Sequence, residues 1–452
     1  MVTASVSDSE PPSAPSSNTG RLSSRASSTT TIEPFDVKKD GDSTLYESPV
    51  TNSRRLSLTS SKPDDGYEEA LRHNSAMAPR NTQKRQVAAP AGDQAPLSSG
   101  RRAGAGWEQS AIRWAPLNVP LKRRLQMLAV LWHSMSIPIF LSSFLLLCSI
   151  PLLWPLVVPY LIYTFLFSDA QSNGTLSRRS DFIRRSNVWA AFASYFPMRL
   201  HRTTELEPTR KYIFGYHPHG IISHGAFASF ATEALGFAEL FPGITNSLLT
   251  LDSNFRIPFY REYILGLGIS SVSRESIENL LSKGGVDGEG MGRAVTIVIG
   301  GARESLDAKP GQMRLVLNSR KGFVKLAIRM GADLVPVLSF GENDLYDQVD
   351  SEKHPYIHKF QMLVKKSMGF TIPLFHARGI FNYDVGLMPY RRDVNVVVGK
   401  PIPVVQQGAK DGKVEQAYLE QVHAEYVQEL RRLWDEYKDT FAQDREGELE
   451  TI

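Results

Sequence analysis

Three of the ten histidines in this chain of 452 residues fall within eight positions of one another: His217, His219 and His224. The first two flank Pro218 and are followed by Gly220, and the run begins directly after an apolar stretch. Histidine is the side chain best suited to general-base work near neutral pH. Loops at strand ends often carry catalytic groups, and a proline followed by a glycine gives a stiff loop whose backbone can approach a ligand. The run is therefore predicted to be the centre of an active site.

A second polar cluster, Gly300, Gly301, Arg303 and Glu304, follows another apolar stretch. Paired glycines allow a tight turn with accessible backbone N–H groups. A glutamate can orient and charge-stabilise a histidine, and an arginine can hold a phosphate. Neither cluster alone is specific for an active site. The two together, after two buried strands of one domain, form a more specific pattern.

The chain contains one cysteine, Cys148, so it cannot form an internal disulfide. This residue lies in an apolar run, where a thiolate would be costly, and no Gly-x-Ser-x-Gly motif is present. Both observations disfavour a covalent enzyme intermediate.

Two other functions stay open on the residues alone. The His-x-His loop could ligate zinc or a pair of metal ions in a hydrolase, with His354, His358 and His376 as further ligands. A non-catalytic lipid-binding adaptor is the second alternative, and the ionisable clusters at strand ends argue against it. The net charge of +4 and pI near 8.9 suit an anionic membrane surface or an anionic co-substrate, but are too small to predict nucleic-acid binding.

The composition changes along the chain and predicts four regions. Residues 1–105 are rich in Ser, Thr, Pro, Gly and Ala and are predicted to be a disordered tail. Residues 106–187 hold a run, 126–167, without any Asp, Glu, Lys or Arg, which is long enough to cross a bilayer twice. Residues 188–445 form the globular domain, and residues 446–452 form a C-terminal tail.

The apolar run is predicted to be a helical hairpin. Pro151 and Pro155 lie just past its middle, where they would break a continuous helix. Lysines and arginines flank both of its ends, which places both ends in the cytosol. The hairpin would then enter the membrane and return, fully or partly across it. The alternative is a buried core hairpin of a soluble protein.

The globular domain is predicted to be α/β, because apolar runs typical of buried strands alternate with amphipathic helical stretches. The predicted strands are Tyr212–Tyr216, Ser247–Leu251, Ala294–Ile299, Leu334–Phe340 and Val394–Val398. The clearest predicted helices are Gly322–Met330 and Val414–Phe441.

An ordered series of motifs carries a family resemblance that covers roughly residues 110–445. The series is Tyr195-Phe196-Pro197, His217-Pro218-His219-Gly220, Ile299-Gly300-Gly301-Ala302-Arg303-Glu304-Ser305-Leu306, Arg320-Lys321-Gly322-Phe323-Val324-Lys325-Leu326-Ala327, Ser339-Phe340-Gly341-Glu342-Asn343-Asp344-Leu345-Tyr346, Arg378-Gly379 and Val397-Val398-Gly399-Lys400-Pro401-Ile402. With these motifs the chain resembles the type-2 diacylglycerol acyltransferase family, which includes monoacylglycerol and wax-ester acyltransferases.

The resemblance implies that a long-chain acyl-CoA esterifies diacylglycerol, or a monoacylglycerol or fatty alcohol, at the endoplasmic reticulum membrane or the lipid-droplet surface. It implies a glycerol-phosphate-acyltransferase-like domain with acyl-CoA as co-substrate and no cofactor or metal. The positive charges that flank the hairpin predict that this domain faces the cytosol, and a homo-oligomer stays an open option. The motif of that wider group is His, four residues, then Asp. Here His224 stands where the Asp would follow His219, so Glu304 is the candidate replacement, with His224 second.

On this interpretation His219 is the general base, and His217 either shares that role or positions the loop. For His224 a structural role is favoured. The expected substrate-binding residues are Pro218, Gly220, Gly300, Gly301, Arg303 and Asn343. The expected contacts to CoA phosphates are Lys309, Arg320, Lys321 and Lys325, each of which could equally lie on a solvated surface.

Overall fold

The computed structural model describes residues 36–40, 43–47, 57–61, 114–115, 119–348, 363, 375–408 and 413–452. Most of the predicted tail, 1–105, lies outside these residues. Three antiparallel strands do fall within it, which the prediction of a disordered tail did not anticipate: β1 (Asp36–Asp40), β2 (Ser43–Glu47) and β3 (Ser57–Ser61). They extend the edge of the main sheet, because β3 pairs with β4 (Arg199–Arg202).

The domain is built on one mixed sheet, and all five predicted strands are present in it. Among the described residues its order is β1-β2-β3-β4-β13-β10-β5-β8-β6-β7. Its inner strands are β5 (Lys211–His217), β6 (Thr245–Thr250), β7 (Ser270–Ser271), β8 (Arg293–Val298), β10 (Ala332–Phe340) and β13 (Asn395–Val398). The five strands from β10 to β7 run parallel, and β13 is antiparallel to β10. The predicted mixed α/β class is confirmed.

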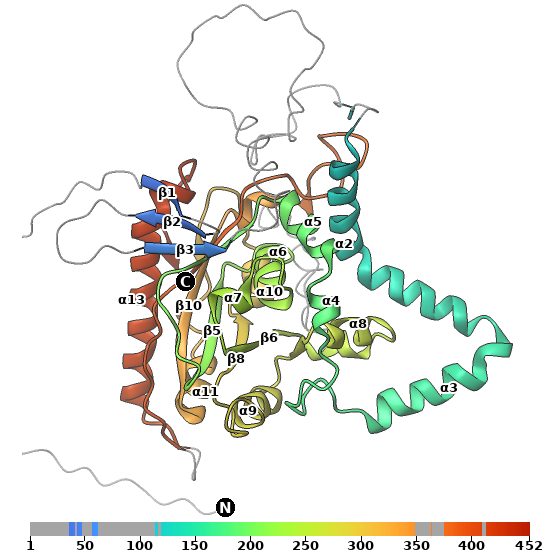
Figure 1. Ribbon diagram of the computed structural model, residues 1–452, viewed down its shortest axis with the longest axis horizontal. Coiled ribbons are helices and arrows are strands. Elements are labelled where there is room, and N and C mark those ends of the chain that lie inside the picture. The colour runs from blue at the N-terminus through green and yellow to red at the C-terminus, as the bar shows by residue number, and fades with distance from the viewer. Residues whose placement is uncertain are drawn as a thin grey trace, which may run out of the picture.

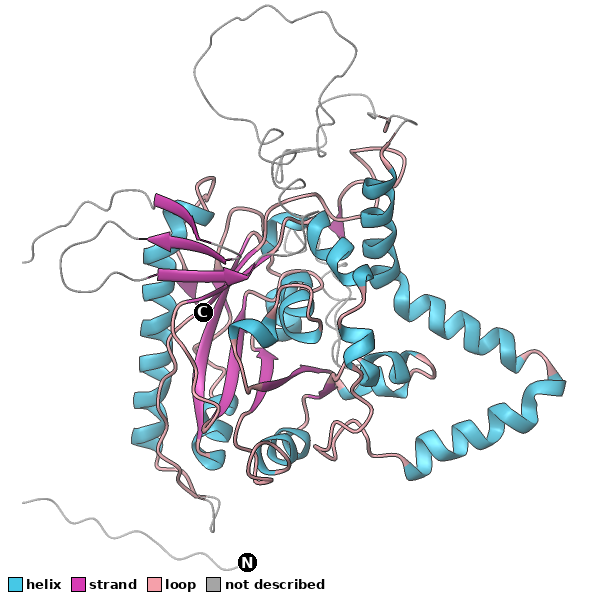
Figure 2. Ribbon diagram, in the orientation of Figure 1, coloured by secondary structure: helices cyan, strands magenta, loops and turns pink. Residues whose placement is uncertain are grey.

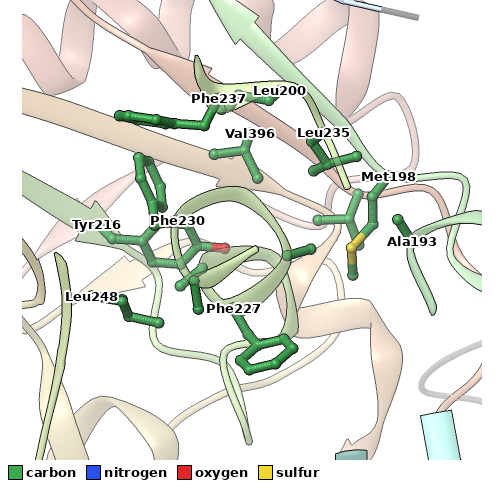
Figure 3. Packing of buried hydrophobic residues seen from close by; sticks show 14 of the residues in the cluster. Ala193, Met198, Leu200, Tyr216, Phe227, Phe230, Leu235, Phe237, Leu248 and Val396 are labelled. Carbon is green, nitrogen blue, oxygen red and sulfur yellow. The ribbon is translucent and has the colours of Figure 1, made fainter. Parts of the chain in front are cut away.

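Strand β5 is buried on both faces, and its alternating side chains enter two different cores. Tyr212, Phe214 and Tyr216 join one core, together with residues of helices α5 (Asn187–Tyr195), α6 (His224–Ala226) and α7 (Phe237–Leu240). Figure 3 shows Tyr216 in this core with Phe230, Phe237 and Leu248. Ile213 joins the other core, with helices α9 (Arg274–Ser282), α11 (Gly322–Met330) and α13 (Gln416–Phe441). Helices thus cover both faces of the sheet, and α13 runs along one of them (Figure 1).

The apolar run forms two helical arms that project from the domain (Figure 2). Helix α2 (Leu121–Cys148) ends just before Pro151, and a 3-10 turn, Pro151–Leu153, leads into α3 (Trp154–Ile162). The predicted helix break near Pro151 is therefore confirmed. Helix α2 also contains Pro138, and it bends part-way along its length in Figure 1.

The two arms differ in length. Helix α2 is the one helix in the described part of the chain that is long and apolar enough to cross a membrane, whereas the apolar stretch of the second arm, Pro151–Phe167, is shorter. The first turns of α2 pack on the domain through Gln126, Ala129 and Val130. The remaining apolar side chains are largely exposed, including those of Leu145, Leu146, Leu152, Leu156, Leu166 and Phe167.

The remaining short elements connect these layers. They are α4 (Asp181–Arg184), α8 (Tyr260–Gly266), α10 (Gly301–Ser305), β9 (Arg314–Leu315), β11 (Asp347–Gln348), β12 (Phe375–His376) and β14 (Glu450–Thr451), with 3-10 turns at Asp252–Arg256 and Glu342–Leu345 and π turns at Tyr163–Phe167 and Phe227–Ala231. The segment predicted as a C-terminal tail is held by β14, which pairs with β9.

Candidate active site

Three parallel strands end side by side and bring the two predicted clusters together. In the register of the sheet, His217 at the end of β5 lies opposite Leu338 of β10, and Tyr216 lies opposite Val298 at the end of β8. The segments that follow these strands therefore meet at one edge of the sheet, where α/β domains place their ligands. These segments are the histidine loop after β5, helix α10 after β8, and the turn that starts at Glu342 after β10.

His219 is half-buried, and its hydrogen bond fixes the tautomer of its ring. Its Nδ1 lies 3.0 Å from the carbonyl oxygen of Gly220. A carbonyl oxygen can only accept, so Nδ1 carries the proton and Nε2 keeps its lone pair. Burial lowers the pKa of His219 below its ordinary value, although bonds to the backbone oppose the shift. A neutral ring with an unprotonated Nε2 has the form that a general base requires.

Glu304 contacts His219 through the backbone rather than through the ring. One carboxylate oxygen accepts the backbone N–H of His219 at 2.7 Å, and the other accepts that of Val316 at 2.9 Å. Glu304 is 2% exposed, and burial raises its pKa to about 7 against the opposing effect of these two hydrogen bonds. The sequence predicted Glu304 as the acid partner of the His219 ring, whereas in the structure the carboxylate binds the backbone of His219 and the ring bonds to the carbonyl of Gly220.

His217 is fully buried on the α13 side of the sheet. Its Nε2 lies 3.1 Å from the hydroxyl of Tyr426, and that hydroxyl donates to the carbonyl of Gly215 at 3.0 Å. Burial lowers the pKa of His217 to about 3, so the ring is neutral. Its Nδ1 is sealed inside the protein without a hydrogen-bond partner. Of the two roles predicted for His217, this environment fits the positioning of the loop.

His224 is an internal anchor, as the sequence favoured. Its Nε2 lies 2.8 Å from the hydroxyl of Tyr346, and its ring packs 5.0 Å from that of Phe196. The ring of His133, from helix α2, lies 5.4 Å away. The histidine loop is thereby packed directly against the first arm of the apolar hairpin.

Glu342 holds the second half of the histidine loop, and sequence reasoning missed it. Its carboxylate accepts the backbone N–H groups of His224 and Gly225, at 2.7 and 2.9 Å, and the hydroxyl of Tyr216 at 2.9 Å. Burial raises its pKa to about 7. Two buried carboxylates, Glu304 and Glu342, thus bind the backbone of one loop. The available signal was the position of Glu342 just after a buried strand, although only its neighbour Asn343 was singled out.

At two positions of the site a residue larger than glycine would collide with these glutamate side chains. Gly220 has a φ of +60°, and a Cβ there would lie 2.7 Å from Cγ of Glu342. A Cβ on Gly300 would lie 2.1 Å from the carboxylate of Glu304. Gly301 has a φ of +57° and open space around it. The predicted glycines therefore lie at the site, and two of them leave room for the glutamates that hold the loop.

The other predicted residues are spread around this edge. Pro218 is buried within the loop, whereas Arg303 is exposed. The side-chain amide of Asn343 donates to the carbonyl of Gln312 at 2.9 Å. Arg320 is exposed, and its guanidinium reaches the carbonyl of Gly300 at 3.4 Å.

The three predicted lysines differ in their surroundings. Lys321 is ion-paired with Glu420 at 2.5 Å, Lys309 is half-buried, and Lys325 is exposed on α11. Of the four candidate phosphate-binding residues, Arg320 contacts the predicted glycine turn.

The metal-hydrolase alternative finds no ligand set in the described residues, where no three His, Cys, Asp or Glu side chains are grouped to hold an ion. His376 lies 3.5 Å from the carboxylate of Asp347. His354 and His358 lie outside the described residues.

Comparison with known proteins identifies the family to which this chain belongs. A sequence model described as diacylglycerol acyltransferase matches residues 144–451. The chain belongs to the diacylglycerol acyltransferase family. It is therefore an acyltransferase, and the predicted resemblance is confirmed.

Several curated relatives match almost over their full length. The chain is 49% identical over 342 residues to Diacylglycerol O-acyltransferase 2A of Umbelopsis ramanniana, covering 75% of this chain and 94% of the relative. It is 44% identical to Diacylglycerol O-acyltransferase 2 of Dictyostelium discoideum, covering 75% and 99%. It is 45% identical to 2-acylglycerol O-acyltransferase 1 of Bos taurus, covering 73% and 96%. No solved structure matches.

Proposed function

We propose that this acyltransferase makes triacylglycerol by transferring the acyl group of a long-chain acyl-CoA to the free hydroxyl of diacylglycerol. Two of the relatives quoted above, at 49% and 44% identity, are named diacylglycerol O-acyltransferases, and these names support this reaction. The structural observation that carries the mechanism is the bond from Nδ1 of His219 to the carbonyl of Gly220, which leaves Nε2 as a base. The domain is proposed to be of the glycerol-phosphate-acyltransferase-like type.

In the proposed reaction, Nε2 of His219 accepts the proton of the lipid hydroxyl while that oxygen attacks the thioester carbonyl carbon. Backbone N–H groups near Gly220 or at Gly300 and Gly301 stabilise the oxyanion of the tetrahedral intermediate. The carbon–sulfur bond then breaks, and CoA leaves as a thiol with the proton returned from His219. The protein forms no covalent bond to the acyl group, and acyl-CoA enters as a co-substrate rather than as a bound cofactor.

Glu304 and Glu342 support this reaction by holding the loop on which His219 lies. Glu304 accepts the backbone N–H of His219 at 2.7 Å, and Glu342 accepts those of His224 and Gly225 at 2.7 and 2.9 Å. A base must be held close to its target, because small displacements of a catalytic group cost large factors in rate. His217 contributes through its contact with Tyr426 on the opposite face of the sheet.

The apolar arms support a location in a membrane, where both diacylglycerol and its product are soluble. Their tips expose large apolar side chains, and basic residues flank both ends of the run. We infer that the hairpin is inserted in the endoplasmic reticulum membrane with the catalytic domain in the cytosol, and that the enzyme also reaches lipid droplets. Protection of the C-terminal half from protease in sealed microsomes would contradict this topology.

A second acceptor has specific support. A relative that is 45% identical is named 2-acylglycerol O-acyltransferase 1. The same base could deprotonate a hydroxyl of a monoacylglycerol, because the chemistry at the hydroxyl is identical.

The test is the incorporation of labelled oleoyl-CoA into lipid by microsomes that contain the protein, with diacylglycerol or monoacylglycerol added and the products separated. His219→Ala should lower the rate by about 10²–10⁴-fold at matched protein levels. His423→Ala is the matched control, since Nε2 of His423 also lies beside a backbone carbonyl, at 3.2 Å from that of Leu317, but on α13. A His219→Ala enzyme within a few-fold of wild type would remove this residue from the base role.

A further inference from the structure

Arg378, from the Arg378-Gly379 motif, has no role in the site described so far. It is only 6% exposed, on the segment that follows β12. Its Nε donates to the carbonyl of Gly379 at 3.3 Å, and its guanidinium lies 5.0 Å from the ring centre of Tyr383. Among the described residues, its Nη1 and Nη2 have no hydrogen-bond or ion-pair partner, yet neither atom is sealed from solvent. These two N–H₂ groups therefore face accessible space.

Arg391 reaches the same place from the other end of this segment. The backbone N–H of Arg378 donates to the carbonyl of Met388 at 2.9 Å, which brings the chain back shortly before Arg391. Arg391 is 8% exposed, its guanidinium lies 4.1 Å from the ring centre of Tyr195, and its Nη1 donates to Gln126 at 2.8 Å. The segment passes beside the first turns of α2 in Figure 1.

Arg123 completes a cluster of three guanidinium groups. It is half-buried and lies one helical turn before Gln126 on α2, so both side chains share a face of the helix. Burial is the main reason that the pKa of Arg391 is lowered to about 10, and the nearby charges of Arg378 and Arg123 lower it further. The three positive charges are therefore close enough to repel one another.

No ion pair compensates the charge of this cluster in the described part of the chain, although the carboxyl group of Asp384 is buried on the same segment as Arg378 and Arg391. No carboxylate there is in ion-pair contact with Arg123, Arg378 or Arg391. Buried charges are costly unless they are paired, and three mutually repelling cations are more costly still. Guanidinium groups present planar pairs of N–H donors that match the oxygens of phosphate. A phosphoryl group carries the charge and the acceptors that this cluster needs.

We propose that Arg123, Arg378 and Arg391 form a binding site for a phosphoryl group. The site lies close to the histidine loop, since Tyr195 under Arg391 packs 4.8 Å from Phe196, and Phe196 packs 5.0 Å from His224. Two ligands carry such a group here. One is acyl-CoA, whose phosphates would be held while its thioester reaches His219, and this source rests on the proposed function. The other is a phospholipid headgroup at the start of the apolar helix.

The first experiment compares two acyl donors in the full-length enzyme in membranes. Arg378→Gln and Arg391→Gln should each raise the KM for oleoyl-CoA about tenfold or more while kcat stays within threefold, because a charge-assisted bond to phosphate is lost. The same variants should not change the KM for S-oleoyl-pantetheine, a thioester without phosphate. Arg431→Gln is the matched control, an exposed arginine on α13 that contacts Thr451 at 3.3 Å.

The second experiment tests the phospholipid source. Purified variants are mixed with phosphatidylcholine vesicles with and without phosphatidic acid, and bound protein is measured by flotation. An unchanged KM for oleoyl-CoA, with binding reduced only on vesicles that contain phosphatidic acid, would assign the site to the headgroup. An unchanged KM and unchanged vesicle binding would overturn the proposal.

A purely structural role for the arginines gives a different result. Arg378→Gln and Arg391→Gln would then lower kcat equally with both donors and lower the melting temperature, which would also overturn the proposal. Arg378→Lys and Arg391→Lys keep the charge without the paired donors, and each should give a KM between wild type and the Gln variant. A wild-type enzyme that forms no triacylglycerol would refute the proposed function, whereas the vesicle measurement would still report phosphate binding.

Discussion

Glu342→Gln is the most direct test of how the histidine loop is held. In the wild-type protein the carboxylate accepts three hydrogen bonds, from the N–H groups of His224 and Gly225 and from the hydroxyl of Tyr216. The glutamine keeps the size of the side chain, but one of its two polar atoms is an N–H₂ group. Whichever way the amide is turned, that group faces at least one backbone N–H, so two donors oppose each other.

The size of the effect follows from this geometry. The whole cluster is buried, with Glu342 2% exposed and both His224 and Tyr216 fully buried. A buried donor left without an acceptor costs about 1–3 kcal/mol. The loop can avoid this cost only by moving away from Glu342, which displaces His219. We therefore expect a loss of about 1–3 kcal/mol in the free energy of unfolding and a fall in kcat of about 10–100-fold.

The assay is acyl transfer from oleoyl-CoA with purified enzyme in detergent, together with thermal unfolding. Tyr216→Phe removes one donor and leaves both backbone bonds to Glu342, so its loss of kcat should be much smaller. Glu429→Gln is the control for the substitution itself, because Glu429 pairs with Arg432 on α13. A Glu342→Gln enzyme with kcat within threefold of wild type and unchanged stability would refute the inference that this carboxylate positions the loop.

Two further outcomes follow from the same contacts. Gly220→Ala should abolish most acyl transfer, because the residue has a φ of +60° and the new Cβ would lie 2.7 Å from Cγ of Glu342; an active alanine variant would contradict this loop geometry. The second outcome concerns pH. The folded-state pKa values of Glu304 and Glu342 are both about 7, above the ordinary value of 4.5. Between pH 4.5 and pH 7 the folded state therefore binds more protons than the unfolded state. The contribution of each carboxyl to stability should therefore fall as the pH rises from 4.5 to 7. The advantage in melting temperature of the wild type over Glu342→Gln should shrink from pH 5 to pH 8, and an advantage that grows would reverse the sign of the argument.

The sequence by itself determined the elements and most of the loop that is proposed to be catalytic. Buried parallel strands appear as short apolar runs whatever their neighbours are, so the five strands and the helix Gly322–Met330 could be located from local pattern. The break near Pro151 was equally visible, because proline interrupts a helix through its own covalent geometry. The His217–Gly220 loop and its pairing with Glu304 followed from the strand ends and the family resemblance.

Only the tertiary structure decided which side chains hold that loop. Strand order brings β10 beside β5, which places Glu342 against His224 across more than a hundred residues of sequence, and no local period encodes such a contact. The same is true of Arg123, Arg378 and Arg391. They come from the start of an apolar helix and from a segment after β12, and they meet because Gln126 of that helix binds Arg391. Local sequence sets which residues form a strand or a helix, whereas long-range packing sets which charges share one buried place.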